Sequence, residues 1–199
     1  MYTRVLTFTG IKDVDAALSM IRDTALPVVR SQRGYQGLIV SADRSSGVFG
    51  ILSRWETEAD RDASESALTK TRQETQQRIG GELTVEMFEE RVVEVAQPPA
   101  AGSALMVTRF RVDRAKIDET IEFFEREVAP QITAAPGFRT LRNMINRETG
   151  DGIVGTVWDD QQAMQAAAEA AQPRRAEATT RGVTFGDISY REIVFTDLP

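Results

Sequence analysis

The sequence predicts an α+β chain made of two tandem βαββαβ repeats. A set of landmark residues occurs twice, 103 positions apart. The set is Pro27, Gly34-Tyr35 and Trp55 in the first half, and Pro130, Gly137-Phe138 and Trp158 in the second. The chain has only two tryptophans, and each half holds one at the equivalent place. The order of strand-like and helix-like segments is also the same in both halves, which favours duplication of one unit.

The first repeat begins with a β-branched and aromatic segment at 5–8, followed by apolar residues at helical spacing. Asp13 is suited to cap this helix, and Pro27 should kink or shorten it because proline lacks a backbone donor. Gly34 suits a left-handed helix exit. The remaining elements are two strands at 35–42 and 48–55 joined by a hairpin loop, a helix from the capping box at Thr57 to about Ile79, and a strand at 83–95.

The second repeat follows the same order. Its elements are a strand at 105–112, a helical stripe at 117–128 with Pro130 near its end, strands at 138–146 and 153–158 around a hairpin loop, an alanine-rich helix capped by Asp159 or Asp160 and interrupted by Pro173, and a strand at 185–195. The acidic residues at the helix starts are interpreted as caps rather than metal ligands, and no metal site is expected.

These elements divide the chain into a domain at 1–95, a linker at 96–102 rich in proline and alanine, and a second domain at 103–199. Each βαββαβ unit is the ferredoxin-like arrangement, with helices on one face of an antiparallel sheet. The bare face must be covered. We therefore expect the two domains to pair sheet to sheet as an α+β barrel pseudo-dimer, and a further homodimer is left open.

Composition excludes several classes of function. The formal charge of −6 and a pI near 4.9 disfavour binding to nucleic acid, and Arg174-Arg175 is interpreted as a solvated helix face. The chain has no Cys and no His, which removes thiolate nucleophiles, catalytic triads and the usual zinc and haem ligands. No signal peptide or long apolar run is present in the sequence, so a cytoplasmic protein is expected, with no membrane partner.

Each repeat resembles a domain of the antibiotic-biosynthesis-monooxygenase family, in the dimeric α+β barrel superfamily. The features that carry the resemblance are the late-helix proline, the turn at 33–37 or 136–138, and a third strand that ends in Trp55-Glu56 or Trp158-Asp159. The resemblance implies a pocket between the sheet and the helices. Some relatives are oxygenases that act on polycyclic aromatic substrates without a cofactor, others degrade haem, and many have no established activity. No cofactor is expected here.

The haem-degrading relatives use an Asn on the first strand, a Trp at the end of the third and a His on the second helix. The tryptophan is present in both repeats. The Asn position falls on Leu6 and Thr108, and the His position falls on Ser64 and Ala167. Haem degradation by that mechanism is therefore disfavoured.

The candidate ligand-binding residues lie on strands at matched positions in the two repeats. They are Trp158, Thr108, Thr156 and Asn143 in the second repeat and Trp55 and Ser53 in the first. A tryptophan can stack on a flat ligand or fill the core, and the hydroxyl two residues earlier can orient a ligand or bond across strands. Because Leu6 stands where the second repeat has Thr108, we expect the open pocket in the second repeat.

Two kinds of function are consistent with these residues. The first is a protein of unassigned activity that binds a small apolar or aromatic molecule between sheet and helices. The alternative is a cofactor-independent monooxygenase that acts on an aromatic or polyketide-like substrate. No catalytic base can be assigned, because without histidine the base would be Asp, Glu, Tyr, Lys or the substrate itself.

Overall fold

The computed structural model describes residues 1–198 and confirms the α+β class with two βαββαβ repeats. The first repeat contains β1 (Tyr2–Thr9), α1 (Val14–Met20), the π-helical turn η1 (Ile21–Ala25), α2 (Leu26–Arg30), β2 (Tyr35–Asp43), β3 (Val48–Trp55), α3 (Glu58–Ala63), α4 (Glu65–Ile79) and β4 (Glu82–Val95).

The second repeat has the same succession of elements. It contains β5 (Ala104–Arg111), a 3-10 turn η2 (Arg114–Lys116), α5 (Ile117–Phe123), the π-helical turn η3 (Phe124–Val128), α6 (Ala129–Thr133), β6 (Phe138–Ile145), β7 (Asp151–Trp158), α7 (Gln161–Ala170), α8 (Gln172–Thr180) and β8 (Thr184–Thr196).

The chain folds into two compact units. One comprises Met1–Met87 together with the chain end from Ile193, and the other comprises Phe88–Glu192. The long strands β4 and β8 are therefore each divided between the units. The predicted boundaries at residues 95 and 103 describe the repeat in the sequence, and as domain limits they remain a prediction.

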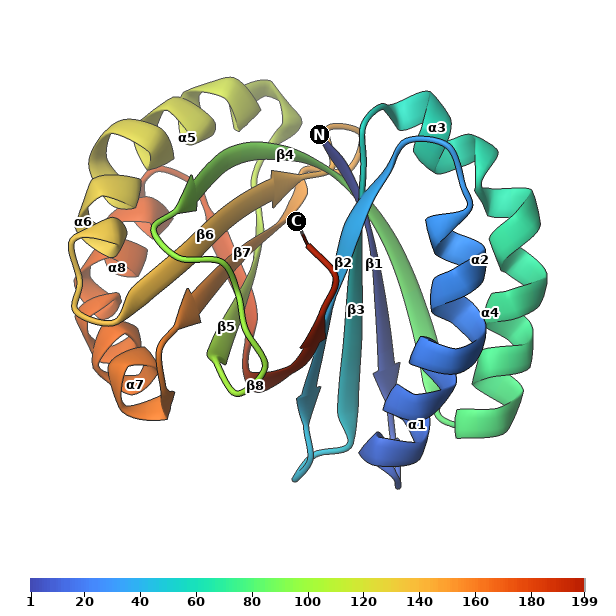
Figure 1. Cartoon of the computed structure of the whole chain (residues 1–199). Helices are drawn as coiled ribbons and strands as arrows, with labels where there is room; N and C mark the ends of the chain where they lie inside the picture. The colour runs from blue at the N-terminus through green and yellow to red at the C-terminus, as the bar shows by residue number, and fades with distance from the viewer. Residues whose placement is uncertain (199) are drawn as a thin grey trace. The chain divides into compact units, whose positions relative to one another are not determined.

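In the first unit, β3 is the central strand. It pairs antiparallel with β1 on one side and with β2 on the other. The end of the chain also contacts β2, because the Asp197 N–H donates to the Leu38 carbonyl at 2.8 Å. Helices α1, α2 and α4 lie along one face of these strands (Figure 1). The buried residues between helices and strands include Phe8, Val40 and Phe49.

In the second unit the strand order is β8-β5-β7-β6-β4, and all neighbours are antiparallel. The first four strands have the order expected of a ferredoxin-like repeat. The fifth is the later part of β4, which comes from the first repeat. Helices α5 to α8 lie on one face of this sheet (Figure 1). The core between them is the place where a pocket can form.

Both repeats accommodate the late-helix proline with a wide helical turn. The Leu26 N–H donates to the Ile21 carbonyl, and the Ala129 N–H donates to the Phe124 carbonyl, each five residues back. A wide turn leaves room for the proline ring, which clashes with the preceding turn of a regular α-helix. The helix therefore continues through Pro27 to Arg30 and is not shortened.

The second helix of each repeat is broken once. In the first repeat the break is at Ser64, between α3 and α4. In the second it is at Ala171, and Pro173 stands in the first turn of α8, where its missing N–H costs nothing. The predicted caps are confirmed, because Thr57 accepts from the Asp60 N–H and Asp160 accepts from the Ala163 N–H.

The start of the linker is attached to β6. The Ala96 N–H donates to the Arg139 carbonyl at 2.8 Å, and the Thr140 hydroxyl donates to the Gln97 carbonyl at 3.0 Å. Arg139 also donates to the Pro98 carbonyl. This part of the linker is thus fixed by hydrogen bonds within the second unit.

Candidate ligand-binding site

The site is built from a row of residues on the helix-facing side of the second sheet. Thr108 on β5 stands opposite Val154 on β7, which in turn stands opposite Asn143 on β6. Because side chains alternate along a strand, Met106 and Phe110 share this face with Thr108. The fold thus places two polar groups, Thr108 and Asn143, in one row of an otherwise apolar face.

Trp158 lies at one end of this face and is almost completely buried, with 1% of its surface exposed. Its ring makes an edge contact with Phe138, with centroids 5.8 Å apart. Its indole N–H donates to the Thr156 hydroxyl at 3.0 Å. The predicted hydroxyl two residues before the tryptophan therefore holds the indole in place.

The first repeat contains the same bond. The Trp55 indole N–H donates to the Ser53 hydroxyl at 3.1 Å, and Ser53 lies 3.4 Å from the Arg4 carbonyl that accepts its proton. The repetition of the Trp-hydroxyl pair thus belongs to the scaffold. Thr156 differs from Ser53, because no acceptor for its hydroxyl proton is present among residues 1–198.

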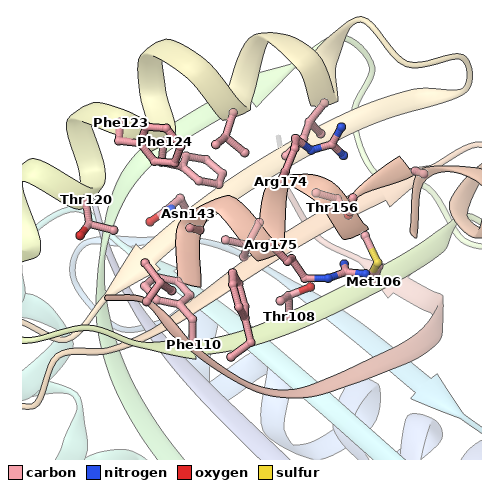
Figure 2. A pocket seen from close by; sticks show the side chains of 18 of the residues that line it. Met106, Thr108, Phe110, Thr120, Phe123, Phe124, Asn143, Thr156, Arg174 and Arg175 are labelled. Atoms are coloured by element: carbon pink, nitrogen blue, oxygen red, sulfur yellow. The ribbon is translucent and has the colours of Figure 1, made fainter. Parts of the chain in front are cut away.

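A cavity of about 90 Å³ lies between this face and helices α5 to α8 (Figure 2). Most of its walls are apolar. The lining residues are Met106, Thr108, Phe110, Thr120, Phe123, Phe124, Val128, Ile132, Asn143, Val154, Thr156, Trp158, Ala167, Ala171, Arg174, Arg175, Ala178, Val183 and Phe185. A ligand there would meet hydrocarbon on most sides and polar groups at a few points, which is typical of small-molecule sites.

The polar groups of the cavity are buried and have unused hydrogen-bonding capacity. Asn143 is 3% exposed, and its side-chain oxygen Oδ1 has no hydrogen-bond partner. Thr108 is 7% exposed, and its hydroxyl has no partner within the described part of the chain. Burying the Asn143 oxygen without a partner destabilises the fold by roughly 1–3 kcal/mol. A ligand that donates to it would remove that cost.

A glycine makes the far end of the cavity possible. Phe110 stands opposite Gly152 in the β5–β7 pairing. A Cβ atom at position 152 would lie 2.1 Å from the Phe110 ring. The first repeat has Phe8 opposite Phe49 at this place, with the two rings in edge contact at 6.4 Å. The phenylalanine ring therefore packs on backbone in the second repeat and on another ring in the first.

Two arginines from the start of α8 also line the cavity. The Arg175 guanidinium donates to the Ala168 carbonyl at 3.1 Å, and in Figure 2 it extends in the direction of Met106 and Thr108. Arg174 is half-buried, and burial followed by the charge of Arg175 lowers its pKa. A guanidinium carries its charge at any physiological pH. The cavity is thus apolar inside and cationic at this side.

The equivalent row of the first repeat is apolar. The strand pairings align Leu6, Ile51 and Val40 with Thr108, Val154 and Asn143. The prediction that Leu6 and Thr108 are equivalent is thereby confirmed. The first-repeat cavity is about 50 Å³, roughly half the volume of its counterpart.

Arg4 occupies the first-repeat position that corresponds to Met106. It is 2% exposed, and its guanidinium lies 5.5 Å from the centre of the Trp55 ring. It donates to the Ser64 hydroxyl at 3.0 Å and to the Arg61 carbonyl at 2.7 Å, and lies 3.0 Å from the Glu65 carboxylate. Its side chain therefore fills space that remains open in the second repeat.

The structure brings together four of the six predicted site residues. Trp158, Thr108, Thr156 and Asn143 all line the larger cavity. Ser53 lines the smaller one, and Trp55 is fully buried beside it without lining it. Their role in binding stays a prediction. The position that holds His in haem-degrading relatives is Ala167 in the second repeat. Ala167 also lines the larger cavity, and its small side chain takes up little of the cavity volume.

Sequence reasoning missed three charged residues. Arg174 and Arg175 were interpreted as a solvated helix face, yet both line the cavity. Arg4 directly precedes the strand predicted at 5–8. Arginine is normally exposed at such a place, but Arg4 is buried here. A proline one residue before the arginine pair is a signal for a helix start, and a helix start near a pocket could have drawn attention to Arg174.

Comparison with known proteins supports the class of protein that the fold defines. Residues 103–179 match the family model of antibiotic biosynthesis monooxygenases. The family resemblance of the second repeat is thereby confirmed. An uncharacterized protein of Mycobacterium tuberculosis is 26% identical over 166 residues, which cover 83% of this chain and 74% of that protein.

Solved structures share the fold over nearly the whole chain. An anthrone oxidase-like protein superposes with a TM-score of 0.71 at 15% identity, covering 98% of this chain and 92% of that one. A heme-degrading enzyme from Listeria monocytogenes has a TM-score of 0.58 at 6% identity, covering 97% of this chain and 99% of that one. At these identities the likeness shows the fold alone.

Two features of residues 1–198 concern membranes and metal ions. No helix there is long and apolar enough to cross a membrane. No group of three or more Asp, Glu, His or Cys side chains in that range is placed to hold a metal ion.

Proposed function

We propose that this protein binds a small apolar or aromatic molecule in the cavity of its second repeat. The observation that carries the proposal is the polar row of Thr108 and Asn143 inside apolar walls. The Asn143 oxygen is buried without a partner, which destabilises the fold, and the first repeat has Leu6 and Val40 in place of Thr108 and Asn143. A ligand that forms hydrogen bonds with Thr108 and Asn143 would explain why the second repeat has polar residues where the first has apolar ones.

The size of the cavity points to a ligand of about one ring. Its volume of about 90 Å³ is far below the several hundred Å³ of pockets that hold larger ligands. It is also smaller than the roughly 150 Å³ apolar cavity in which benzene binds. Arg174 lines both the cavity and a hollow outside it, so a ligand can extend outward. One ring with its polar end at the mouth fits this geometry.

The alternative is oxidation of an aromatic substrate without a cofactor, and its support is that residues 103–179 match a family model named for monooxygenases. In that reaction the protein would stabilise a substrate anion, and Asn143 and Thr108 are placed to hydrogen-bond one. However, no Asp, Glu, Lys or Tyr lines the cavity. The proton would therefore have to leave the substrate without a base from the lining, and binding is the function better supported.

Replacing Thr108 with Leu should strongly weaken binding in this cavity. Leucine removes a hydroxyl and adds bulk to a space of about 90 Å³, as Leu6 does in the first repeat. We expect the dissociation constant for phenol, measured by isothermal titration calorimetry, to rise at least about tenfold, which corresponds to roughly 1.4 kcal/mol. Dioxygen uptake with the same ligand, followed with an electrode, separates the oxygenase from the binding protein.

The Thr108→Val variant is the matched control, because valine has nearly the shape of threonine and lacks only the hydroxyl. Phenol should bind to it more weakly than to the natural protein but more tightly than to Thr108→Leu. Unchanged binding to Thr108→Leu, with its fold intact by circular dichroism, would show that phenol binds elsewhere and would overturn the proposal.

A further inference from the structure

The two arginines of α8 add a charge to the cavity that nothing in its lining balances. Arg174 and Arg175 line it, and none of the other lining residues is acidic. Neither arginine forms an ion pair with a carboxylate among residues 1–198. Two guanidinium groups next to an apolar cavity, with no acid in its wall, favour an anion there.

The acids of the outer hollow do not supply the missing partner. Arg174 shares that hollow with four glutamates and two other arginines, Glu119, Glu122, Glu127, Glu177, Arg126 and Arg181. Glu122 pairs with Arg126 at 2.9 Å, and Glu177 pairs with Arg181 at 3.0 Å. Glu119 and Glu127 also line the hollow, but within residues 1–198 neither forms an ion pair with Arg174. No carboxylate contributes to the lowered pKa of Arg174, which follows from burial and the charge of Arg175.

A different group in the cavity can bond to the other end of a ligand. Asn143 lies on β6, across the cavity wall from α8, and its buried Oδ1 accepts no hydrogen bond. A hydroxyl or N–H on the ligand would supply the missing donor. The walls between these polar groups include the rings of Phe124 and Phe110. In Figure 2 the two rings, Asn143 and both arginines surround one space.

We propose that the ligand of this cavity is a small aromatic carboxylate that also carries a hydroxyl group. The carboxylate meets the guanidinium groups of Arg174 and Arg175, the ring contacts the phenylalanines, and the hydroxyl donates to Asn143 Oδ1. This inference rests on the proposed binding function and specifies the charge of the ligand. It also explains why an acidic chain keeps two adjacent arginines at a cavity.

The test compares two probes of similar size, one with a carboxylate and one with a neutral hydroxymethyl group at the same ring position. We expect 4-hydroxybenzoate to bind at least about tenfold more tightly than 4-hydroxybenzyl alcohol, because charge-assisted bonds to guanidinium are roughly twice as strong as neutral ones. Calorimetric titration measures both. In the Arg174→Gln and Arg175→Gln variants the preference, taken as the ratio of the two dissociation constants, should fall at least threefold. Arg175→Lys keeps the charge and should retain most of the preference.

Arg126→Gln is the matched control, because it removes one positive charge from the outer hollow and does not touch the cavity. It should leave the preference within twofold. Equal binding of both probes to the natural protein would overturn the inference and leave the binding function standing. Failure of both probes and of phenol to bind would overturn the proposed function itself. A preference that survives in Arg174→Gln and Arg175→Gln would place the anion elsewhere and also overturn the inference.

Discussion

Replacing Glu90 with Gln should lower the free energy of unfolding by about 3 kcal/mol, the loss expected when one partner of a buried ion pair is removed. The Glu90 carboxylate lies 2.9 Å from the Arg142 guanidinium, between β4 and β6 of the second unit. Their side chains are 2% and 7% exposed. Without the carboxylate, the buried Arg142 guanidinium loses a charged acceptor. Urea denaturation followed by circular dichroism measures the loss.

The neighbouring glutamate supplies the control. Glu89 pairs with Arg91 and Arg147, but its side chain is 22% exposed, so water can replace the lost contacts. Glu89→Gln should cost less than about 1 kcal/mol, as for other ion pairs near the surface. The double variant Glu90→Leu, Arg142→Met should be much closer to the natural protein than Glu90→Gln. A loss below about 1 kcal/mol in Glu90→Gln would contradict the account, since it would mean that the pair is not desolvated.

Replacing Asn143 with Val should stabilise the protein and impair binding in the same experiment. Valine is the residue that the first repeat has at this place, at position 40. The change removes a buried amide oxygen that has no partner, and we expect the free energy of unfolding to rise by about 1 kcal/mol. The dissociation constant for phenol should rise about fivefold or more, since one hydrogen bond of roughly 1 kcal/mol is lost.

The reciprocal change, Val40→Asn, is the matched control. It places an amide in the apolar row of the first repeat, where Leu6 and Ile51 are its neighbours. It should destabilise the protein and leave phenol binding unchanged. If Asn143→Val were instead destabilised by more than about 1 kcal/mol, the amide would be a structural group with partners, and its value as a binding group would be lost.

The repeat could be predicted from the sequence because its landmarks are demanded by backbone geometry and core packing. Gly34 and Gly137 both adopt positive φ, near 73° and 76°, which side-chain-bearing residues disfavour. Trp55 and Trp158 fill the same place in each core. Such positions are marked by residue type alone, and strand order then follows from the periodicity of the segments between them.

The candidate site could be predicted only where it lies on regular strands. Thr108 was predicted from the position that holds Asn in haem-degrading relatives, and Thr156 from its place two residues before Trp158, on the same face of the strand. Arg175 was not, because the helix break at Ala171 rotates α8 relative to α7, and no sequence pattern specifies that rotation. The ion pair of Glu90 was missed as well. Two adjacent glutamates in the strand predicted at 83–95 favour solvent exposure, whereas Glu90 is buried against a strand of the second repeat.

The pairing of β4 with a strand of the other repeat explains why the burial of Glu90 was not predicted. The later part of β4 belongs to the first repeat in sequence and pairs with β6 of the second repeat. Its burial is therefore decided by residues more than fifty positions away, such as Arg142. A prediction that pairs strands only within each repeat cannot include the contact between Glu90 and Arg142.

The central claim is that a small aromatic molecule binds between sheet and helices of the second repeat. The most direct test is a titration of protein labelled with 13C at its methionine methyl groups, observed by NMR, with phenol as the probe. Met106 lines the cavity, and Met20 lies on α1 of the first repeat. We predict a saturable shift of the Met106 signal, identified with Met106→Leu, and no shift of Met20. A Met106 signal that stays unchanged up to the solubility limit of phenol would contradict the claim.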